Sequence, residues 1–174
     1  ISSEHDIVSP GTGVAIVTEG GNQNAKTIEY AGNSEAFIAW ADFREGANAD
    51  IYGQRLNASM EALFQENGIP IASTEEQELK PRATFVENTT SFIAWKKGDE
   101  DSRVFYQFID ENGTVFSDDR TISDNQALQT APRVKRSATG EVFVNWKDLR
   151  DDPIDGDQYF QKINTNGDKQ WGDG

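Results

Sequence analysis

The densest acidic run of this sequence holds the first candidates for chemistry. They lie between residues 148 and 157, where five aspartates fall within ten residues: Asp148, Asp151, Asp152, Asp155 and Asp157. Ca²⁺ prefers six to eight oxygen ligands, and aspartates around a glycine turn at Gly156 could supply several of them. The spacing differs from the twelve-residue helix-loop-helix calcium loop, because the terminal bidentate glutamate is missing. The sequence favours a solvated acidic loop, with a calcium site as the alternative and no other cofactor.

Other catalytic side chains form no recognisable constellation. The only histidine is His5 and there is no cysteine, which excludes thiol catalysis and leaves a serine triad or a histidine metal centre without its parts. With 30 acidic residues in the chain, a pair of carboxylates does not discriminate between an enzyme and a binding protein. We therefore expect a protein that is not an enzyme. A glycoside hydrolase is the alternative, because its two carboxylates could come from repeats far apart in the sequence.

A repeat of about 51 residues must position all of these groups. Each copy contains a block that ends in tryptophan: Phe37 to Trp40, Phe92 to Trp95, and Phe143 to Trp146. Pro81 and Pro132 each stand 14 residues before the tryptophan of their copy, and Lys26 takes that place in the first. Self-similarity at a fixed period indicates a repeat architecture.

The rest of each repeat predicts further strands. A second shared block alternates with period two and ends in Asn or Asp: Asp50 to Asn57, Arg103 to Asp110, and Asp157 to Asn164. Turns ending in Asn112-Gly113 and Asn166-Gly167 follow two of these blocks, and Asn-Gly is a strong hairpin signal. A short fourth strand contains Ile71 or Ile122. Four antiparallel strands repeated radially make β-propeller blades, so the predicted fold is all-β, with repeats at about 26–80, 81–131 and 132–174.

The residues that recur in every repeat are expected to be structural. We predict that the tryptophans pack between blades and that the glutamines are buried amides bonded to a neighbouring strand or turn. These residues are Trp40, Trp95, Trp146, Gln54, Gln107 and Gln161. The alternative for the tryptophans is stacking on a sugar, and for the glutamines a ligand contact. Asp42 with Arg44, and Asp148 with Arg150, repeat one spacing that predicts a salt bridge or a turn cap.

The phase of the repeat bears on what the chain contacts. Gly13 to Ile16 matches Gly68 to Ile71, so residues 13–18 are expected to form a spare fourth strand. The third repeat is expected to lack its own fourth strand. Propellers typically close with four to eight blades, so we expect the partners to be other blades of a parent protein or, alternatively, a second copy of this chain. An open row of sheets is a further alternative.

The pattern from Phe37 to Arg44, followed by Asp50-Ile51-Tyr52-x-Gln54-Arg55-Leu56-Asn57, resembles the propeller-like repeats of large secreted and cell-surface proteins of Bacteroidota. The resemblance covers residues 13 to 174. It implies an extracellular propeller used for surface display, adhesion or assembly, and it identifies no ligand. The second repeat departs from the pattern, because Lys96-Lys97-Gly98 replaces the segment that contains the aspartate.

The amino-acid composition narrows the range of ligands that the protein is expected to bind. The net charge of −14 disfavours nucleic acid and anionic membranes, which bind basic surfaces. No apolar run reaches the ~20 residues that a membrane-spanning helix needs. We therefore predict a secreted or cell-surface module that binds protein or glycan without catalysing a reaction. The alternatives are a fragment of a propeller glycoside hydrolase and a calcium-dependent adhesin.

Overall fold

The strands form three separate antiparallel sheets in a computed structural model that describes residues 13–31, 34–87, 90–116 and 120–174. His5 lies outside the described residues. Sheet 1 contains β1 (Gln23–Tyr30), β2 (Ala36–Asp42), β3 (Asp50–Leu56) and β4 (Ile69–Ala72). Sheet 2 contains β5 (Glu78–Glu87), β6 (Thr90–Lys97), β7 (Arg103–Ile109) and β8 (Arg120–Thr121). Sheet 3 contains β9 (Gln129–Arg136), β10 (Val142–Asp148) and β11 (Asp157–Ile163).

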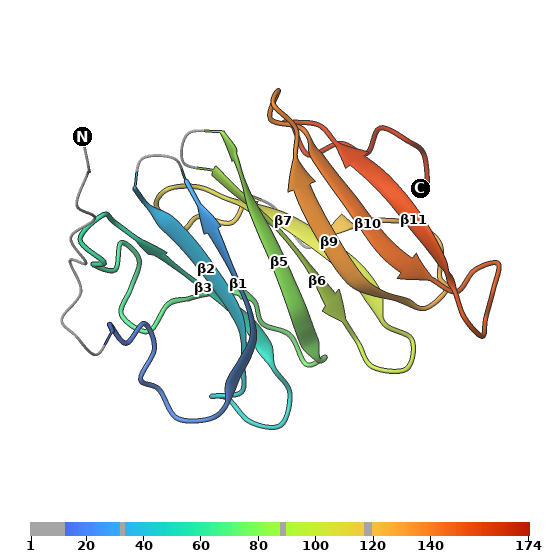
Figure 1. The fold of residues 1–174 in the computed structure, drawn as a ribbon. Coiled ribbons are helices and arrows are strands. Elements are labelled where there is room, and N and C mark those ends of the chain that lie inside the picture. The colour runs from blue at the N-terminus through green and yellow to red at the C-terminus, as the bar shows by residue number, and fades with distance from the viewer. Residues whose placement is uncertain (1–12, 32–33, 88–89, 117–119) are drawn as a thin grey trace, which may run out of the picture.

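Each sheet is a meander in which consecutive strands pair, and the three sheets stack face to face as propeller blades do (Figure 1). The first strands of the three sheets, β1, β5 and β9, are neighbours, since β5 contacts both of the others. We call these three the inner strands, because in a propeller they line the central axis. The predicted all-β propeller fold is confirmed. The described residues contain no helix, and so none that could cross a membrane.

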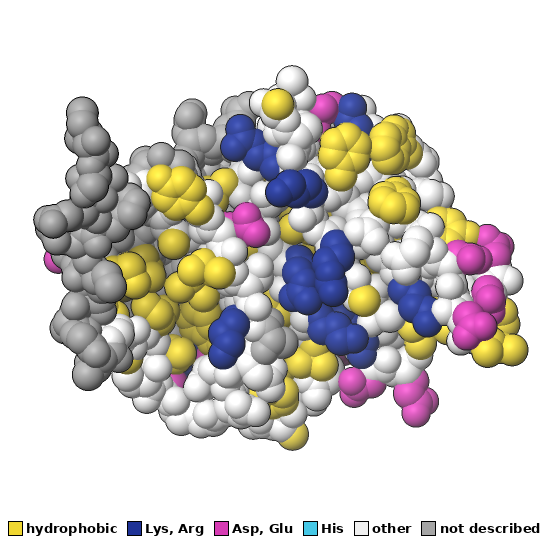
Figure 2. Space-filling model, viewed as in Figure 1, with side chains coloured by type: hydrophobic (Ala, Val, Ile, Leu, Met, Phe, Trp, Pro, Cys, Tyr) yellow, Lys and Arg dark blue, Asp and Glu magenta, His cyan; other side chains and the backbone are white. Residues whose placement is uncertain are grey.

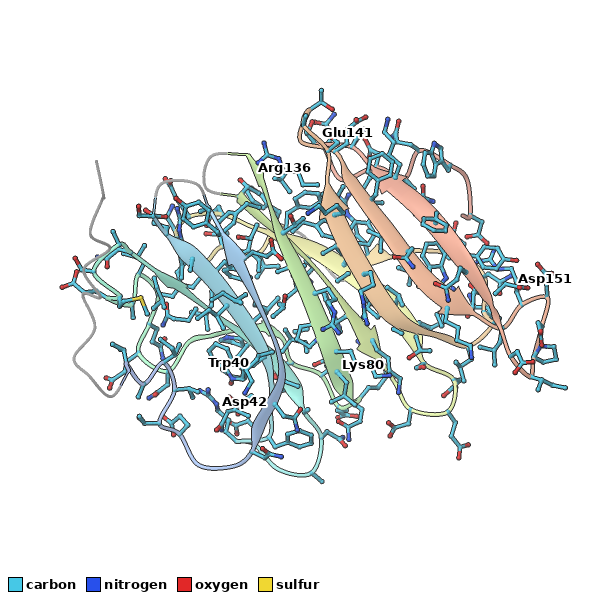
Figure 3. All side chains as sticks on the ribbon, viewed as in Figure 1. Trp40, Asp42, Lys80, Arg136, Glu141 and Asp151 are labelled. Carbon is cyan, nitrogen blue, oxygen red and sulfur yellow. The ribbon has the colours of Figure 1, made fainter. Side chains whose placement is uncertain are left out.

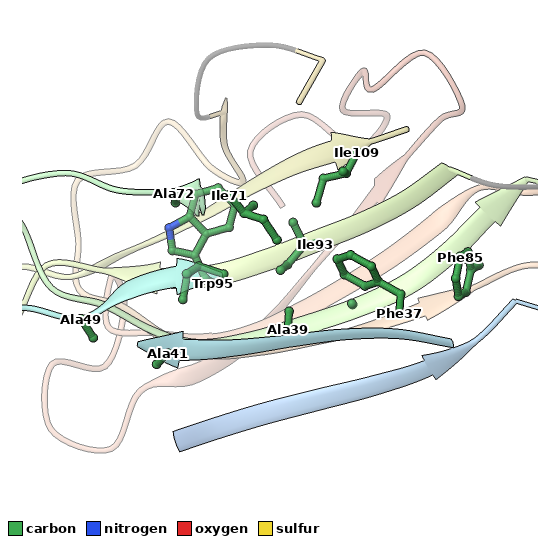
Figure 4. Close-up of a cluster of buried hydrophobic side chains, with 12 residues drawn as sticks. Phe37, Ala39, Ala41, Ala49, Ile71, Ala72, Phe85, Ile93, Trp95 and Ile109 are labelled. Atoms are coloured by element: carbon green, nitrogen blue, oxygen red, sulfur yellow. The ribbon is translucent and has the colours of Figure 1, made fainter. Parts of the chain in front are cut away.

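Two apolar layers hold the sheets together. Phe37, Ile71 and Trp95 belong to the layer between sheets 1 and 2, which Figure 4 shows in close-up. Phe92, Val144 and Trp146 belong to the layer between sheets 2 and 3. Side chains alternate between the two faces of a strand, so Phe92 and Trp95, three residues apart on β6, reach opposite neighbours. The block that ends in tryptophan therefore works as a double-sided packing element.

The sheets at the two ends keep one face each outside these layers. On β1, Ile28 and Tyr30 are each 67% exposed, because they point away from sheet 2. On sheet 3, Phe143 and Trp171 form an aromatic pair 5.7 Å apart, at the repeat positions that Phe37 and Phe64 occupy in sheet 1. In sheet 1 that pair faces sheet 2, whereas in sheet 3 it faces outward.

The ends of the repeats differ in part from expectation. Sheet 3 has three strands, as the phase of the repeat predicts. The structure assigns no strand to residues 13–18, which instead lie beside the connection between β3 and β4, where the Thr18 amide donates to Asn67 Oδ1 over 2.9 Å. The fourth strand of sheet 2 is only two residues long, and Ile122 follows it as a buried side chain.

Each inner strand contains an irregularity at the same repeat position. The register shifts between Asn24 and Thr27, between Leu79 and Arg82, and on β9 between Thr130 and Arg133. Lys80 and Ala131 have φ angles of 56° and 53° at these points, and each precedes a proline. Both the left-handed conformation and the position before proline are unfavourable for such residues. A bulge redirects the side chains next to it, so these positions determine which groups face the axis.

Candidate functional site on the inner strands

The repeated aspartates at the end of β2 and β10 are structural. Asp148 is fully buried and accepts hydrogen bonds from the Trp146 indole at 2.9 Å and from the Arg150 guanidinium at 2.8 Å. The Arg150 guanidinium also covers the Tyr159 ring at 3.9 Å. Burial by itself would raise the pKa of Asp148, but the hydrogen bonds from Arg150 and Trp146 outweigh burial and hold that pKa below its ordinary value. Sheet 1 repeats the unit with Trp40, Asp42, Arg44 and Tyr52.

Sheet 2 replaces this unit with one of reversed charge. Lys97 stands at the aspartate position and lies 4.0 Å from Glu78, whereas Gln129 donates to Asp148 at the same place in sheet 3. Lys97 also lies over the Phe105 ring at 5.1 Å. The buried Trp95 indole has no hydrogen-bond partner in the described part of the chain. The departure of the second repeat is therefore a paired substitution at two contacting positions.

The repeated glutamines tie the third strand of a sheet to the turn that follows it. Gln54 donates to the Gln65 carbonyl at 2.8 Å and accepts from the Phe64 amide at 2.9 Å. Gln161 does the same with Gly172 and with the Trp171 amide. Gln107 is also buried, and the corresponding turn includes residues 117–119, which lie outside the described residues. All three glutamines are buried inside the blades.

The acidic loop does not gather its five carboxylates. Asp148 faces inward, Asp152 accepts amide hydrogen bonds from Ile154 and Asp155 within the loop, and Asp151 accepts the Tyr159 hydroxyl. Asp155 and Asp157 are exposed. Among the residues that the structure describes, no three His, Cys, Asp or Glu side chains lie close enough to hold a metal ion. The calcium site therefore stays a prediction.

A cavity of about 570 Å³ lies on sheet 1, away from the inner strands. Glu45, Asp50, Tyr52 and Ser73 are among its lining residues. Burial raises the pKa of Asp50, although its hydrogen bond with Ser73 opposes that effect. Tyr52 stacks on Trp40, on the face of sheet 1 that turns away from sheet 2. The cavity thus opens onto a face where, in a propeller, another blade would pack.

The inner strands carry a concentration of positive charge that contrasts with the whole chain. Six of the 16 lysines and arginines of the sequence lie on them, and we call these six the axial cations: Lys26, Lys80, Arg82, Arg133, Lys135 and Arg136. Figure 2 shows blue side chains gathered over β5 and β9. Figure 3 places Lys80 and Arg136 toward opposite ends of this surface, and Asp151 on a distant loop.

The axial cations are not neutralised by the described part of the protein. Within it, none of them forms an ion pair. The Arg82 and Arg133 guanidiniums each donate to the carbonyl of the preceding proline, at 2.7 and 3.0 Å. Burial, and then the like charge of Arg133, lower the pKa of Arg82. The two guanidiniums therefore lie close enough to repel each other.

One half-buried carboxylate accompanies these cations. Glu29 lies on β1, on the side that faces sheet 2, opposite Phe37 in the register. Burial raises the pKa of Glu29, and the charge of Lys135 offsets part of that rise. Glu78, at the other end of the inner strands, is fully buried and accepts a hydrogen bond from Thr74 at 2.9 Å. Glu29 is thus a described inner-strand carboxylate that retains partial access to solvent.

The axial cations were not predicted from the sequence. Pro81-Arg82 and Pro132-Arg133 were interpreted only as markers of the repeat, although the recurring arginine was a signal that could have revealed these cations. Glu29 carried no comparable signal, because Thr84 and Lys135 occupy its position in the other repeats.

No protein-family model and no curated protein sequence matches the chain. Solved structures do match it. A thermostable family-43 glycoside hydrolase superposes with a TM-score of 0.53 at 13% identity, covering 89% of this chain and 59% of that one. An endo-1,4-β-xylanase from Bacteroides thetaiotaomicron superposes with a TM-score of 0.53 at 10% identity, and the match covers 91% of this chain and 60% of the xylanase. An endo-arabinase from the same organism superposes with a TM-score of 0.53 at 12% identity, and the match covers 95% of this chain and 63% of the arabinase. The chain therefore spans about 60% of the length of these structures.

These comparisons correct two expectations from the sequence. A binding or scaffolding module that is not an enzyme was predicted, and that prediction was wrong as the leading interpretation, because the three solved structures named above, which share this arrangement, are a glycoside hydrolase, a xylanase and an arabinase. A functional site that is assembled from several blades leaves no catalytic motif in any single segment, so the sequence offered no signal for this alternative. The likeness itself, at 10–13% identity, shows the fold.

Proposed function

We propose that this chain forms three blades of a propeller glycoside hydrolase and that the inner strands face its substrate. The observation that carries the proposal is Glu29, a half-buried inner-strand carboxyl whose pKa is raised by burial. A general acid in glycoside hydrolysis must hold its proton at the working pH, and burial is a means of achieving this. The second carboxylate of the pair comes from another blade, about 5 to 10 Å away. The named xylanase and arabinase direct the first assays to xylan and arabinan.

We propose that the remaining blades belong to the same polypeptide and that the protein acts outside the cell. Two observations support the first point: the two end sheets expose apolar side chains, and the chain spans about 60% of comparable structures. The resemblance of the repeat to those of secreted proteins, together with the location of polysaccharide substrates, supports the second.

The test is release of reducing sugar from arabinan and xylan by the complete polypeptide and its Glu29→Gln variant. Loss of a general acid lowers the rate by roughly 10²- to 10⁴-fold. In the pH profile of the remaining activity, the decline at high pH that is caused by deprotonation of Glu29 should be absent. Glu100→Gln, on an exposed loop, is the matched control and retains full activity. A Glu29→Gln variant as active as the control would overturn the role of Glu29, and absence of hydrolysis across both glycans would overturn the enzyme proposal for these substrates.

A further inference from the structure

The axial cations point to the chemistry of the ligand. The chain as a whole carries a charge of −14, yet the inner strands carry six cations against three acidic residues, Glu29, Glu78 and Glu87. A random distribution of these residues would make the inner strands acidic like the remainder. Positive charge is therefore concentrated on the surface that faces the axis.

Within the described residues none of these cations forms an ion pair, and only Lys135 has its charge acting on an inner-strand carboxyl, that of Glu29. Arg82 and Arg133 occupy equivalent positions on adjacent inner strands, and among the described residues each guanidinium bonds the carbonyl of the proline before it. Lys80 reaches across to Thr130 on β9 with its ammonium 3.3 Å from the hydroxyl. Like charges held together at a partly desolvated surface repel each other, and an anion bound between them would relieve that repulsion.

The backbone beside these residues is strained at two equivalent positions. Lys80 and Ala131 adopt positive φ angles immediately before a proline, a backbone conformation that is unfavourable for residues other than glycine. Such strain persists only where the surrounding structure maintains it, and it is concentrated at functional sites. In both strands the arginine follows two residues later, so the bulge orients the guanidinium.

We propose that the axial cations bind an anionic glycan whose acidic groups are carboxylates, as in a polymer of uronic acids. Planar guanidinium groups match carboxylates with two parallel hydrogen bonds. The acidic remainder of the molecule repels a nucleic acid, whose charge density is far higher. The proposal rests on the inner strands being the substrate-facing surface, and it names the substrate class of that surface.

The experiment is a binding titration of the protein with polygalacturonate, neutral arabinan, a sulfated galactan and duplex DNA at two salt concentrations. The test variant is Arg133→Ala/Lys135→Ala, which removes two exposed axial cations. The control is Lys162→Ala/Lys169→Ala, which removes two cations of the third repeat that pair with Glu141 and Asp124 instead. Both variants have the same net charge, and a melting curve of each verifies that it folds.

The expected result is binding to polygalacturonate that weakens at higher salt, falls roughly tenfold or more in the test variant, and is unchanged in the control. Equal binding to arabinan, equal loss in both variants, or tighter binding to DNA would overturn the proposal. Preference for the sulfated galactan would overturn the assignment of carboxylates. Hydrolysis of a neutral glycan without binding of polygalacturonate would refute this inference and leave the proposed function standing. Binding of polygalacturonate without hydrolysis of any glycan would support this inference and refute the proposed function.

Discussion

Asp148 accepts a hydrogen bond from the Trp146 indole over 2.9 Å at the centre of a buried unit that also holds Arg150. The carboxylate has no exposed surface, so its partners are its only compensation for lost hydration. Replacing it leaves the indole without its acceptor and leaves the Arg150 guanidinium with Ser123 and Asp173 alone.

We expect Asp148→Ala to lower the free energy of unfolding by about 3 kcal/mol, because the change breaks a buried ion pair and removes the acceptor of the buried Trp146 indole. Urea denaturation measures the change. Asp155→Ala, in the exposed loop of the same sheet, is the control and is expected to change stability by less than about 0.5 kcal/mol. A loss equal to that of the control would show that the unit contributes nothing.

The paired substitution in sheet 2 predicts a coupling between two positions. Lys97→Asp brings a carboxylate against Glu78 and should destabilise, while Glu78→Gln removes the buried carboxylate beside the Lys97 ammonium and leaves it the more exposed Glu76, 3.8 Å away. The double variant restores the aspartate and glutamine of sheet 3 and offers an acceptor to the Trp95 indole. A double-mutant cycle should give a favourable interaction of about 1–3 kcal/mol. An interaction near zero would mean that the two positions are independent.

Stability should fall in acid. Hydrogen bonds hold the pKa values of Asp42, Asp148 and Asp173 below the ordinary 3.8, against the effect of burial. Carboxyls with a lowered folded-state pKa contribute stability that is fully present above the unfolded-state value and is lost as pH falls through the folded-state value. Urea midpoints measured from pH 6 to pH 2 should therefore decline below about pH 4, and the decline should be shallower in Asp148→Asn. A midpoint that is constant over this range would contradict the prediction.

The Tyr159 hydroxyl reports on Asp151 directly. The hydrogen bond to Asp151, with burial and the charge of that carboxylate, raises the pKa of Tyr159 to about 12. Asp151→Asn should bring that pKa down toward 10, followed as phenolate absorbance in an alkaline titration. Asp157→Asn, which alters a neighbouring carboxylate without touching the hydroxyl, should leave it unchanged. An identical titration in both variants would show that Asp151 does not set the pKa of Tyr159.

The sequence predicted the blades because the Trp block and the Gln block recur at a fixed period and each alternates with period two. It also predicted the pairing of Asp42 with Arg44. The axial cations required knowing that three separate strands lie side by side, which no single segment encodes. Lys80 illustrates the difficulty. Its equivalents in the other repeats are Ala25 and Ala131, so a comparison of the three copies does not identify a recurring cation at this position. The spare strand at residues 13–18 was inferred from similarity alone, and the segment lies against sheet 1 without pairing as a strand.

The aromatic pair of Phe143 and Trp171 lies on the outer face of sheet 3. The equivalent pair in sheet 1, Phe37 and Phe64, packs against sheet 2. The two end faces of the molecule are consequently unlike surfaces, and a contact that joined one face of a molecule to the other face of a second copy would be heterologous rather than twofold. A heterologous contact has no internal limit: it closes into a ring when the rotation from one molecule to the next divides a full turn, and otherwise it extends into a filament. Whatever covers these two faces therefore also determines whether the protein stays a discrete particle.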